Sequence, residues 1–408
     1  MLRVAITSIG IVSPLGLELE KFWLAVGGGE SAFSAIERFS TAPYGVYRAA
    51  GIGEFVPFQP PKAKQPWTNT RATQFALMAA RKAIDNSGIV FDETVRHETG
   101  VALGSTIACQ DLVRELDVQG IAGNPKTIDP LLFPDASPSA PSCRISLQLG
   151  VDCFNTIVSN GACSGLDAIR HGALAIQLGR ARMALAGGVE ELTRETFVYY
   201  AAMGDLAGGE DSLCRPFDKR RSGALLGEGA VVLLLEEYEH ARARNARIIA
   251  EICGYGACYW PPAGAKGASS GDGPHFAMRQ ALADAGIDRG DVDVIFANAS
   301  GSVAGDAREY SALAELYGEA EMPPITAVKS SLGELNSASG AVQAAICALS
   351  LRDGLVPPTL HYQEQDPACP VPSLVKRPVK RRLEVGLVNA FSTTPGSGAC
   401  SSLVLRAA

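Results

Sequence analysis

The chain has 408 residues, of which 47% are hydrophobic and 19% charged, and its formal net charge is −7. This balance excludes a globally disordered chain, and the lack of a basic excess argues against nucleic acid as a partner. The ten cysteines are scattered without a zinc-type spacing, which indicates reduced thiols and no metal site. The sequence shows no secretory leader and no apolar run of membrane-spanning length. We therefore expect a cytoplasmic protein with no membrane span.

Taken in chain order, the hydrophobic pattern and the Gly/Pro punctuation predict alternating strands and helices. The first elements are a strand over 3–9, a helix from 22, a helix over 70–87, a strand over 101–103 and an irregular proline-rich stretch over 129–142. Next come a strand over 152–158, a turn over 159–164, a helix over 165–179 and strands over 183–186 and 230–235. After a connector over 261–273, we expect helices over 276–286, 305–317 and 338–353, and strands over 292–297, 325–328, 385–388 and 402–405.

The expected strands are short and mostly apolar, and they alternate with helices in both parts of the chain. Such strands are typical of sheets that are covered by helices on both faces. The pattern therefore predicts a layered α/β architecture with mixed sheets. We expect the boundary near 245–250, with an N-terminal half over 1–248 and a C-terminal half over 249–408.

The strand–turn–helix unit at 159–164 carries a candidate nucleophile. It reads Ser-Asn-Gly-Ala-Cys-Ser, which places Cys163 at the N-terminus of the following helix. Unpaired backbone N–H groups at such a terminus favour an anion, so we expect a thiol of lowered pKa that can act as a nucleophile. The alternative is that Cys163 is one more buried structural thiol.

Five blocks in order carry a resemblance that covers nearly the whole chain. They are 4–7 and 12–16 with Phe22 and Trp23; 161–164; 215–218 with Arg221, Gly223 and 227–230; Asn298 and Ala299 with Asp306 and Glu309; and Lys329 and Ser330 with Gly333, Gly340 and Ala341. The chain resembles the β-ketoacyl-acyl-carrier-protein synthases of the thiolase superfamily. The resemblance implies a thiolase-like, duplicated αβαβα five-layer fold that works as a dimer. It places the nucleophile elbow and the dimer and cap insertions in the N-terminal half.

The chain departs from this family at both positions where the family carries a catalytic histidine. The family uses one cysteine, matched here by Cys163, and two histidines that stabilise the enolate formed as malonyl thioester loses carbon dioxide. At the histidine positions this chain has Ser300 and Glu334, and none of its five histidines falls on either position. Ser300 could donate one weak hydrogen bond, whereas an ionised Glu334 would repel an enolate. We therefore expect decarboxylative condensation to be absent or weak.

The resemblance also implies supporting residues around the site. Lys329, Asp306 and Glu309 match the polar network of the family, and a purely structural ion pair is an equally open interpretation of them. The glycine-rich loop that follows Phe391 is longer than in the family. At the position of the family's gating phenylalanine it has Thr393, which puts the gate in doubt.

Two hypotheses of function follow, together with a minor third. In the first, the chain is a chain-length-factor-type subunit of a type II fatty acid or polyketide synthase, polyene systems included, that pairs with a homologous catalytic ketosynthase. Thr106 and Ile107 would then lie at the acyl pocket and dimer contact. In the second, it is a self-standing acyltransferase or atypical condensing enzyme, as a homodimer, that loads Cys163 and uses Glu334 as a base. The third is a non-catalytic scaffold. In the first two hypotheses an acyl carrier protein supplies the acyl phosphopantetheine, and no cofactor is bound.

Overall fold

A single mixed sheet organises the structure, a computed structural model that describes residues 1–58, 70–209, 212–260, 272–392 and 397–408. In the described chain this sheet has ten strands in the order β10-β9-β13-β14-β8-β1-β7-β6-β4-β5. Their bounds are β1 (Val4–Val12), β4 (Thr99–Gly104), β5 (Asn155–Val158), β6 (Met183–Glu190), β7 (Gly229–Glu237), β8 (Ala250–Tyr259), β9 (Val294–Phe296), β10 (Ile325–Thr326), β13 (Val385–Phe391) and β14 (Ala399–Ala407). Strand β1 pairs with β7 and, through residues 4–6, with β8, so it joins the two sets of strands.

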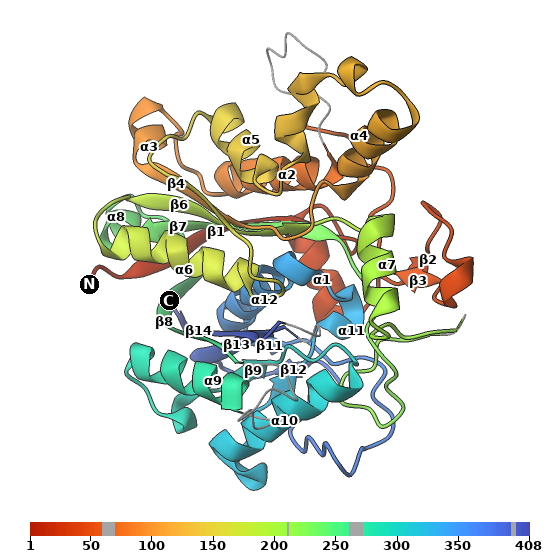
Figure 1. Ribbon diagram of the computed structural model, residues 1–408. Coiled ribbons are helices and arrows are strands. Elements are labelled where there is room, and N and C mark those ends of the chain that lie inside the picture. The colour runs from red at the N-terminus through yellow and green to blue at the C-terminus, as the bar shows by residue number, and fades with distance from the viewer. Residues whose placement is uncertain (59–69, 210–211, 261–271, 393–396) are drawn as a thin grey trace.

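The sheet folds over so that its two sets of strands form separate layers with helices between and outside them (Figure 1). The upper helices are α2 (Arg71–Asn86), α3 (Glu93–His97) and α5 (Ala140–Leu149), and the lower helices are α9 (Asp272–Ala285) and α10 (Val303–Tyr317). The helices between the two layers are α1 (Leu19–Gly28), α6 (Ser164–Gln177), α11 (Lys329–Leu332) and α12 (Ser339–Asp353). This arrangement confirms the αβαβα layering expected from the sequence.

The central layer is held by close packing of α6 against α12. Helix α12 is buried on all sides from Ser339 to Leu351, as expected for a helix with no polar face. Two glycines allow the close approach. A Cβ atom on Gly165 would lie 2.7 Å from the Ser337 carbonyl oxygen, and one on Gly340 would lie 2.7 Å from the Leu166 side chain. The N-termini of the two central helices therefore lie side by side, and the candidate site is built around them.

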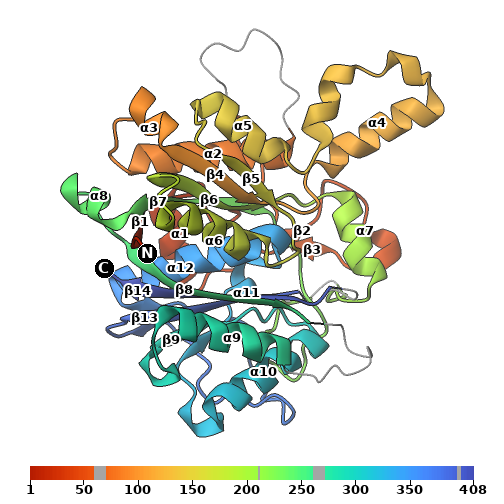
Figure 2. The same cartoon turned by 60° about the vertical axis from the view of Figure 1, so that its left-hand side comes forward.

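The remaining elements surround this core. They are α4 (Gln110–Ala122), α7 (Arg194–Ala202), α8 (Tyr238–Ala243) and two small hairpins, β2 (Ser34–Ala35) with β3 (Arg48–Ala49) and β11 (Leu355–Val356) with β12 (Val379–Lys380). Figure 2 shows α4 projecting from the upper layer.

Several elements differ from those predicted from the sequence. The stretch 129–142 is not irregular, because a 3₁₀ helix covers Pro130–Ala136 and α5 begins at Ala140. Pro130 and Pro141 are tolerated there because they lie in the first turn of each helix, where no N–H donor is needed, whereas Pro134 lies inside the 3₁₀ helix. Helices α4 and α7 and strand β8 were not expected. The boundary between halves at 248/249 stays a prediction, although β8 begins close to it.

Candidate active site

The predicted elbow lies between β5 and α6. Gly161 has a φ of +56°, a left-handed conformation that glycine adopts readily. The Ser164 hydroxyl fixes the turn, because it donates to the Gly161 carbonyl at 2.6 Å and accepts the Asn160 N–H at 2.8 Å. The Thr106 hydroxyl, on the loop after β4, lies 3.1 Å from the same oxygen. The turn holds Cys163 at the N-terminus of α6, as the sequence predicts.

The environment of the Cys163 thiol differs from the expectation. Its side chain is fully buried, and its Sγ donates to the Ala390 carbonyl oxygen at 3.0 Å. Burial, reinforced by the negative charge of Asp167, raises the pKa of the Cys163 thiol far above its ordinary value. The expected lowering of the pKa was therefore wrong, because burial removes the hydration that would stabilise a thiolate. The resting thiol is neutral and engaged in a hydrogen bond.

Asp167 is a site residue that the sequence reasoning missed. It lies one turn after Cys163 on α6, and its carboxylate accepts hydrogen bonds from Asn160 Nδ2 at 2.7 Å, from the Tyr255 hydroxyl at 2.7 Å and from Ser401 Oγ at 2.6 Å. The four-residue spacing from Cys163 was a usable signal, since residues i and i+4 share a helix face. The carboxylate ties the elbow to strands β8 and β14 of the other half of the sheet.

Glu334 forms a buried ion pair with Lys329. Lys329 Nζ donates to Glu334 Oε2 at 2.7 Å and to Asn298 Oδ1 at 2.8 Å, and the two charged side chains are only 2% and 6% exposed. The other carboxylate oxygen of Glu334 accepts the Asn336 N–H at 2.9 Å and the Ser339 hydroxyl at 2.7 Å. Both oxygens of Glu334 are therefore acceptors of strong hydrogen bonds. As an ion-paired carboxylate the residue cannot donate to a substrate carbonyl, and its hydrogen bonds to Lys329, Asn336 and Ser339 make it a weaker base.

Ser300 lies in a buried loop that Asp306 organises. The backbone N–H groups of Ser300 and Gly301 donate to Asp306 Oδ1 at 3.0 and 3.2 Å, and the Phe217 N–H donates to Oδ2 at 2.8 Å. Burial raises the pKa of Asp306 to about 6. Asp306 is thus a loop-positioning residue, and it does not contact Lys329 through any interaction found in the described chain.

Glu309 completes the expected supporting set. Its Oε1 accepts the Asn298 N–H at 2.9 Å and Asn389 Nδ2 at 3.1 Å, whereas its Oε2 is buried without a partner among the described residues. Burial raises the pKa of Glu309 to about 7. Of the three predicted supporting residues, Lys329 therefore pairs with Glu334, while Asp306 and Glu309 bind backbone and amide donors. Asn298 bridges Glu309 and Lys329, because its N–H donates to Glu309 and its Oδ1 accepts from Lys329.

The C-terminal loop is anchored at Phe391, which is buried at the end of β13. Its carbonyl oxygen accepts Asn298 Nδ2 at 3.0 Å. Because Asn298 also accepts from Lys329, a hydrogen-bond chain connects this loop to the Lys329–Glu334 pair. Thr393 lies outside the described residues, so the loss of the family's phenylalanine gate at this position stays a prediction.

Glu190 on β6 is another buried glutamate, and the sequence reasoning also missed it. It extends the polar network around the Lys329–Glu334 pair. Glu190 Oε2 accepts the Ser337 hydroxyl at 2.7 Å and Asn336 Nδ2 at 3.1 Å, and burial raises the pKa of Glu190 to about 7. The Ile107 backbone also hydrogen-bonds to this carboxylate. Ile107 is partly buried beside the cluster that contains Phe197. The acyl-pocket roles of Thr106 and Ile107 stay predictions.

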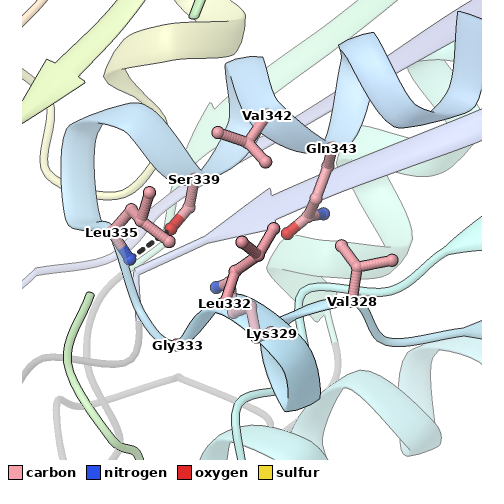
Figure 3. A pocket seen from close by; sticks show the side chains of 8 residues that line it. All are labelled: Val328, Lys329, Leu332, Gly333, Leu335, Ser339, Val342 and Gln343. Carbon is pink, nitrogen blue, oxygen red and sulfur yellow. Dashed lines mark hydrogen bonds between the residues drawn. The ribbon is translucent and has the colours of Figure 1, made fainter. Parts of the chain in front are cut away.

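A small cavity of about 10 Å³ lies between α11 and α12 next to the ion pair. Such a volume holds about one water molecule, so this cavity is not an acyl pocket. In Figure 3 the side chains of Gln343 and Val342 project from α12 toward Leu332 and Val328, and Ser339 hydrogen-bonds to the Leu335 N–H at 2.9 Å. The lining residues are Val328, Lys329, Leu332, Gly333, Leu335, Ser339, Val342 and Gln343.

Neither a metal cluster nor a membrane-spanning helix is present among the described residues. Among the described residues, no three His, Cys, Asp or Glu side chains cluster closely enough to hold a metal ion. No helix of the described chain combines the length and the apolar character needed to cross a bilayer.

Known proteins with similar sequences are condensing enzymes. The chain is 31% identical over 372 residues to a 3-oxoacyl-[acyl-carrier-protein] synthase 2 of Staphylococcus aureus, covering 90% of each protein. It is 30% identical over 406 residues to the enzyme of the same name from Coxiella burnetii, covering 95% of each.

Solved structures agree with this relationship. The ishigamide ketosynthase/chain length factor matches with a TM-score of 0.90 and 32% identity, over 100% of this chain and 99% of that one. A β-ketoacyl synthase from Burkholderia phymatum matches with a TM-score of 0.90 and 28% identity over the whole of both chains. One chain in the structure of a type II polyketide acyl-carrier protein in complex with its ketosynthase matches with a TM-score of 0.87 and 27% identity, over 100% of this chain and 99% of that one. The fold is therefore the thiolase-like ketosynthase fold.

The family assignment rests on both halves of the chain. Residues 1–241 match the family described as β-ketoacyl synthase, N-terminal domain, and residues 249–363 match its C-terminal domain. With the elbow, the paired central helices and the similar proteins in agreement, the chain belongs to the β-ketoacyl synthase family.

Proposed function

We propose that this chain is a chain-length-factor-type subunit of a type II fatty acid or polyketide synthase, polyene-type systems included. In this role it pairs with a homologous catalytic ketosynthase and helps to shape the site in which a carrier-protein-bound acyl chain grows. The acyl groups arrive on the phosphopantetheine arm of an acyl carrier protein. The subunit itself does not carry out decarboxylative condensation.

The observation that carries this proposal is the Lys329–Glu334 pair. Decarboxylation of a malonyl thioester develops negative charge on the thioester oxygen, and each missing hydrogen-bond donor costs about 10²–10³ in rate. At one expected donor position the chain instead holds a carboxylate whose oxygens accept from Lys329, Asn336 and Ser339. The Lys329 ammonium is itself engaged by that carboxylate and by Asn298. These groups satisfy one another, and they are poorly suited to stabilise an enolate.

The state of Cys163 supports the same conclusion. A thioester-forming cysteine needs to be a thiolate, or to have an adjacent base that removes its proton. Here the neutral thiol donates to a backbone carbonyl, its pKa is raised by burial, and its nearest titratable neighbour on α6, Asp167, is an anion. These features favour a structural thiol over a loaded nucleophile.

Two surface features support a protein partner. Strand β5 is the last strand of the sheet in the described chain, so one edge of it has no neighbouring strand, and such an edge is commonly covered by another chain. Beyond it, α4 projects from the upper layer, as Figure 2 shows. Helix α4 and the 3₁₀ helix over Pro130–Ala136 expose large apolar side chains. The exposed side chains are Val118, Ile121, Leu131 and Phe133, at 56%, 87%, 68% and 75%. Thr106 and Ile107 follow β4, the strand beside β5, and so lie near this edge.

The alternative, an acyltransferase or atypical condensing enzyme that loads Cys163 and uses Glu334 as its base, is favoured by one observation. Cys163 lies at the N-terminus of α6, where nucleophilic thiols are found. For Glu334 to act as a base, however, its hydrogen bonds to Lys329, Ser339 and the Asn336 N–H would have to be broken. A non-catalytic homodimeric scaffold remains the third reading, and the partner experiment below distinguishes it.

The test is reconstitution with and without a homologous ketosynthase that carries cysteine and two histidines. We expect the two chains to co-purify as a heterodimer and to elongate malonyl-carrier protein together. The present chain alone should elongate at least about 10³-fold more slowly. Elongation by the purified chain alone at the rate of the pair would overturn the proposal. A stable homodimer that does not bind the ketosynthase would also overturn the proposal, and it would favour the scaffold if the chain in addition transferred no acyl group.

A matched pair of variants separates the roles of the two cysteines. Cys163→Ala in this chain should leave the product yield of the heterodimer within about twofold, whereas the same change at the ketosynthase nucleophile should abolish it. Intact-protein mass spectrometry after incubation with acyl thioesters should show no acyl group on Cys163. An acyl adduct that disappears in Cys163→Ala would support the acyltransferase alternative instead.

A further inference from the structure

Two cysteines lie directly opposite each other on neighbouring strands, away from the ion pair and the elbow turn. Cys258 on β8 and Cys400 on β14 are register partners in an antiparallel ladder. Trp260 lies two residues after Cys258, and Gly398 lies two residues before Cys400. The Trp260 N–H donates to the Gly398 carbonyl oxygen at 2.7 Å. Because hydrogen-bonded pairs recur every second residue, Cys258 and Cys400 also form such a pair, with Cα atoms about 5.5 Å apart. This separation lies within the range of natural disulfides.

The two thiols already interact and lie beside a cation. They share a side-chain hydrogen bond, and Arg308 Nη2 lies 4.0 Å from Cys400 Sγ. Gly273 makes this contact possible, because a Cβ atom there would lie 3.1 Å from Cys400 Sγ and 3.0 Å from Arg308 Nη2. The hydrogen bond from Cys400 and the positive charge of Arg308 lower the pKa of the Cys258 thiol, although partial burial opposes this.

The two cysteines differ in exposure, and this difference suits one to react with peroxide and the other to resolve the product. Cys258 is partly exposed, so a small oxidant can reach it, whereas Cys400 is 1% exposed. The hydrogen bond to Cys258, followed by burial, raises the pKa of Cys400 strongly. An accessible thiol of lowered pKa next to a buried thiol of raised pKa is the arrangement of a peroxide-reactive cysteine with its resolving partner.

We propose that Cys258 and Cys400 form a reversible redox site that reacts with small hydroperoxides. The Cys258 thiolate attacks the peroxide, its sulfur gains one oxygen, and with one proton the peroxide leaves as water (as an alcohol for an organic hydroperoxide). The Cys400 sulfur then displaces hydroxide from the sulfenic acid, and the Cys400 proton leaves with it as a second water. The net change is two thiols and one hydroperoxide to one disulfide, and a dithiol reductant reverses it.

The location of this pair couples it to the candidate active site. Ser401, the next residue on β14, donates to Asp167 and also hydrogen-bonds to the Cys163 thiol. A disulfide at Cys400 would therefore fix the strand that positions both groups. The inference does not depend on the proposed function, because it concerns only this chain's own strands.

The experiment is thiol mapping of the intact, full-length chain before and after exposure to hydrogen peroxide. After removal of reductant, we expect oxidation to remove two of the ten alkylatable thiols and to yield a peptide pair linked through Cys258 and Cys400. Dithiothreitol should restore both thiols. In Cys400→Ser, a sulfenic-acid probe such as dimedone should label Cys258, because the resolving thiol is absent.

The matched control is Cys253→Ser, which removes a partly buried thiol from the same strand. It should still lose two thiols and form the same linked peptide, whereas Cys258→Ser should form none. If Cys258 and Cys400 both stay free at a peroxide dose that oxidises the exposed Cys143, the proposal is wrong. It is equally wrong if the linked peptide joins a different pair of cysteines. Neither outcome would bear on the partner-subunit proposal, which is tested by elongation.

Discussion

The N-termini of the central helices α6 and α12 lie side by side, yet the side chains near them differ in charge. At α6, the elbow turn keeps Cys163 neutral and hydrogen-bonded to a carbonyl. Near α12, the loop holds a buried ion pair between Lys329 and Glu334. The chain keeps the family's cysteine at the first place, whereas at the second it has Glu334 where the resemblance implies a histidine. The comparison shows that the fold and the reaction are encoded by separable sets of residues.

The largest effect on stability is expected when the Lys329 cation near α12 is removed. Lys329→Met leaves the Glu334 carboxylate buried without its ammonium partner, and we expect a loss of about 3–5 kcal/mol in the free energy of unfolding. Urea denaturation measures it. Lys329→Met/Glu334→Leu should recover most of the loss, because no buried charge remains.

The control for this prediction is an exposed ion pair. Arg81 and Asp85 lie on α2 with side chains 54% and 51% exposed and a 3.0 Å contact. Arg81→Ala should change the stability by no more than about 0.5 kcal/mol. A loss of similar size in both variants would mean that the Lys329–Glu334 pair behaves as a surface pair, and the contrast between the two helix ends would fail.

The next largest effect concerns the pH dependence of stability. Burial raises the pKa of Glu309 from 4.5 to about 7, so the folded state binds more protons than the unfolded state between these values. Stability from this group is therefore greatest below about pH 4.5 and falls as the pH rises toward 7, by up to about 3 kcal/mol. Glu309→Gln should lack this slope when urea denaturation is repeated between pH 5 and 7.5.

A surface carboxyl provides the reference for the pH experiment. The Glu93 side chain is 88% exposed, and Glu93→Gln should keep the slope of the wild-type protein. If the difference between wild type and Glu309→Gln does not change with pH, Glu309 is ionised throughout the range. The Oε2 atom without a partner would then have to be reinterpreted.

The neutral, buried state of Cys163 at the elbow is tested by the reactivity of its thiol. Iodoacetamide reacts with thiolates, and Cys163 is neutral and buried whereas Cys143 is exposed. In the native protein at pH 8, we expect Cys143 to be labelled at least about a hundredfold faster than Cys163. Peptide mapping by mass spectrometry measures both rates in one sample. Rapid labelling of Cys163 would instead favour the acyltransferase alternative.

The smallest predicted effect comes from the hydroxyl pair that braces the elbow. Thr106→Val keeps the shape of the side chain but removes the 3.1 Å contact with Ser164 Oγ. We expect a loss of about 1 kcal/mol in the free energy of unfolding, measured by urea denaturation. Thr127→Val, which removes an exposed hydroxyl, is the comparison and should cost less. An equal cost would show that Thr106 does not brace the turn.

The sequence was sufficient for the order of the main strands and helices, because buried strands and amphipathic helices leave clear local patterns. It also located Cys163 at the elbow, since glycine and small residues mark such a turn. It could not show that the carboxylate partner of Lys329 would be Glu334, because Asp306 and Glu309 were equally plausible candidates. Nor could it predict the neutral state of Cys163, which depends on burial by Ala390, a residue more than 200 positions away.

The double pairing of β1 has a consequence for how the chain folds during synthesis. This strand leaves the ribosome well before its two neighbours, β7 and β8, which begin at Gly229 and Ala250. More than half of the chain must therefore be made before either edge of β1 can be covered, and contacts of such long range form slowly. A fragment ending at residue 248 would keep one edge of β1 open and apolar, which invites aggregation. Expression of the isolated halves is thus expected to fail for a topological reason.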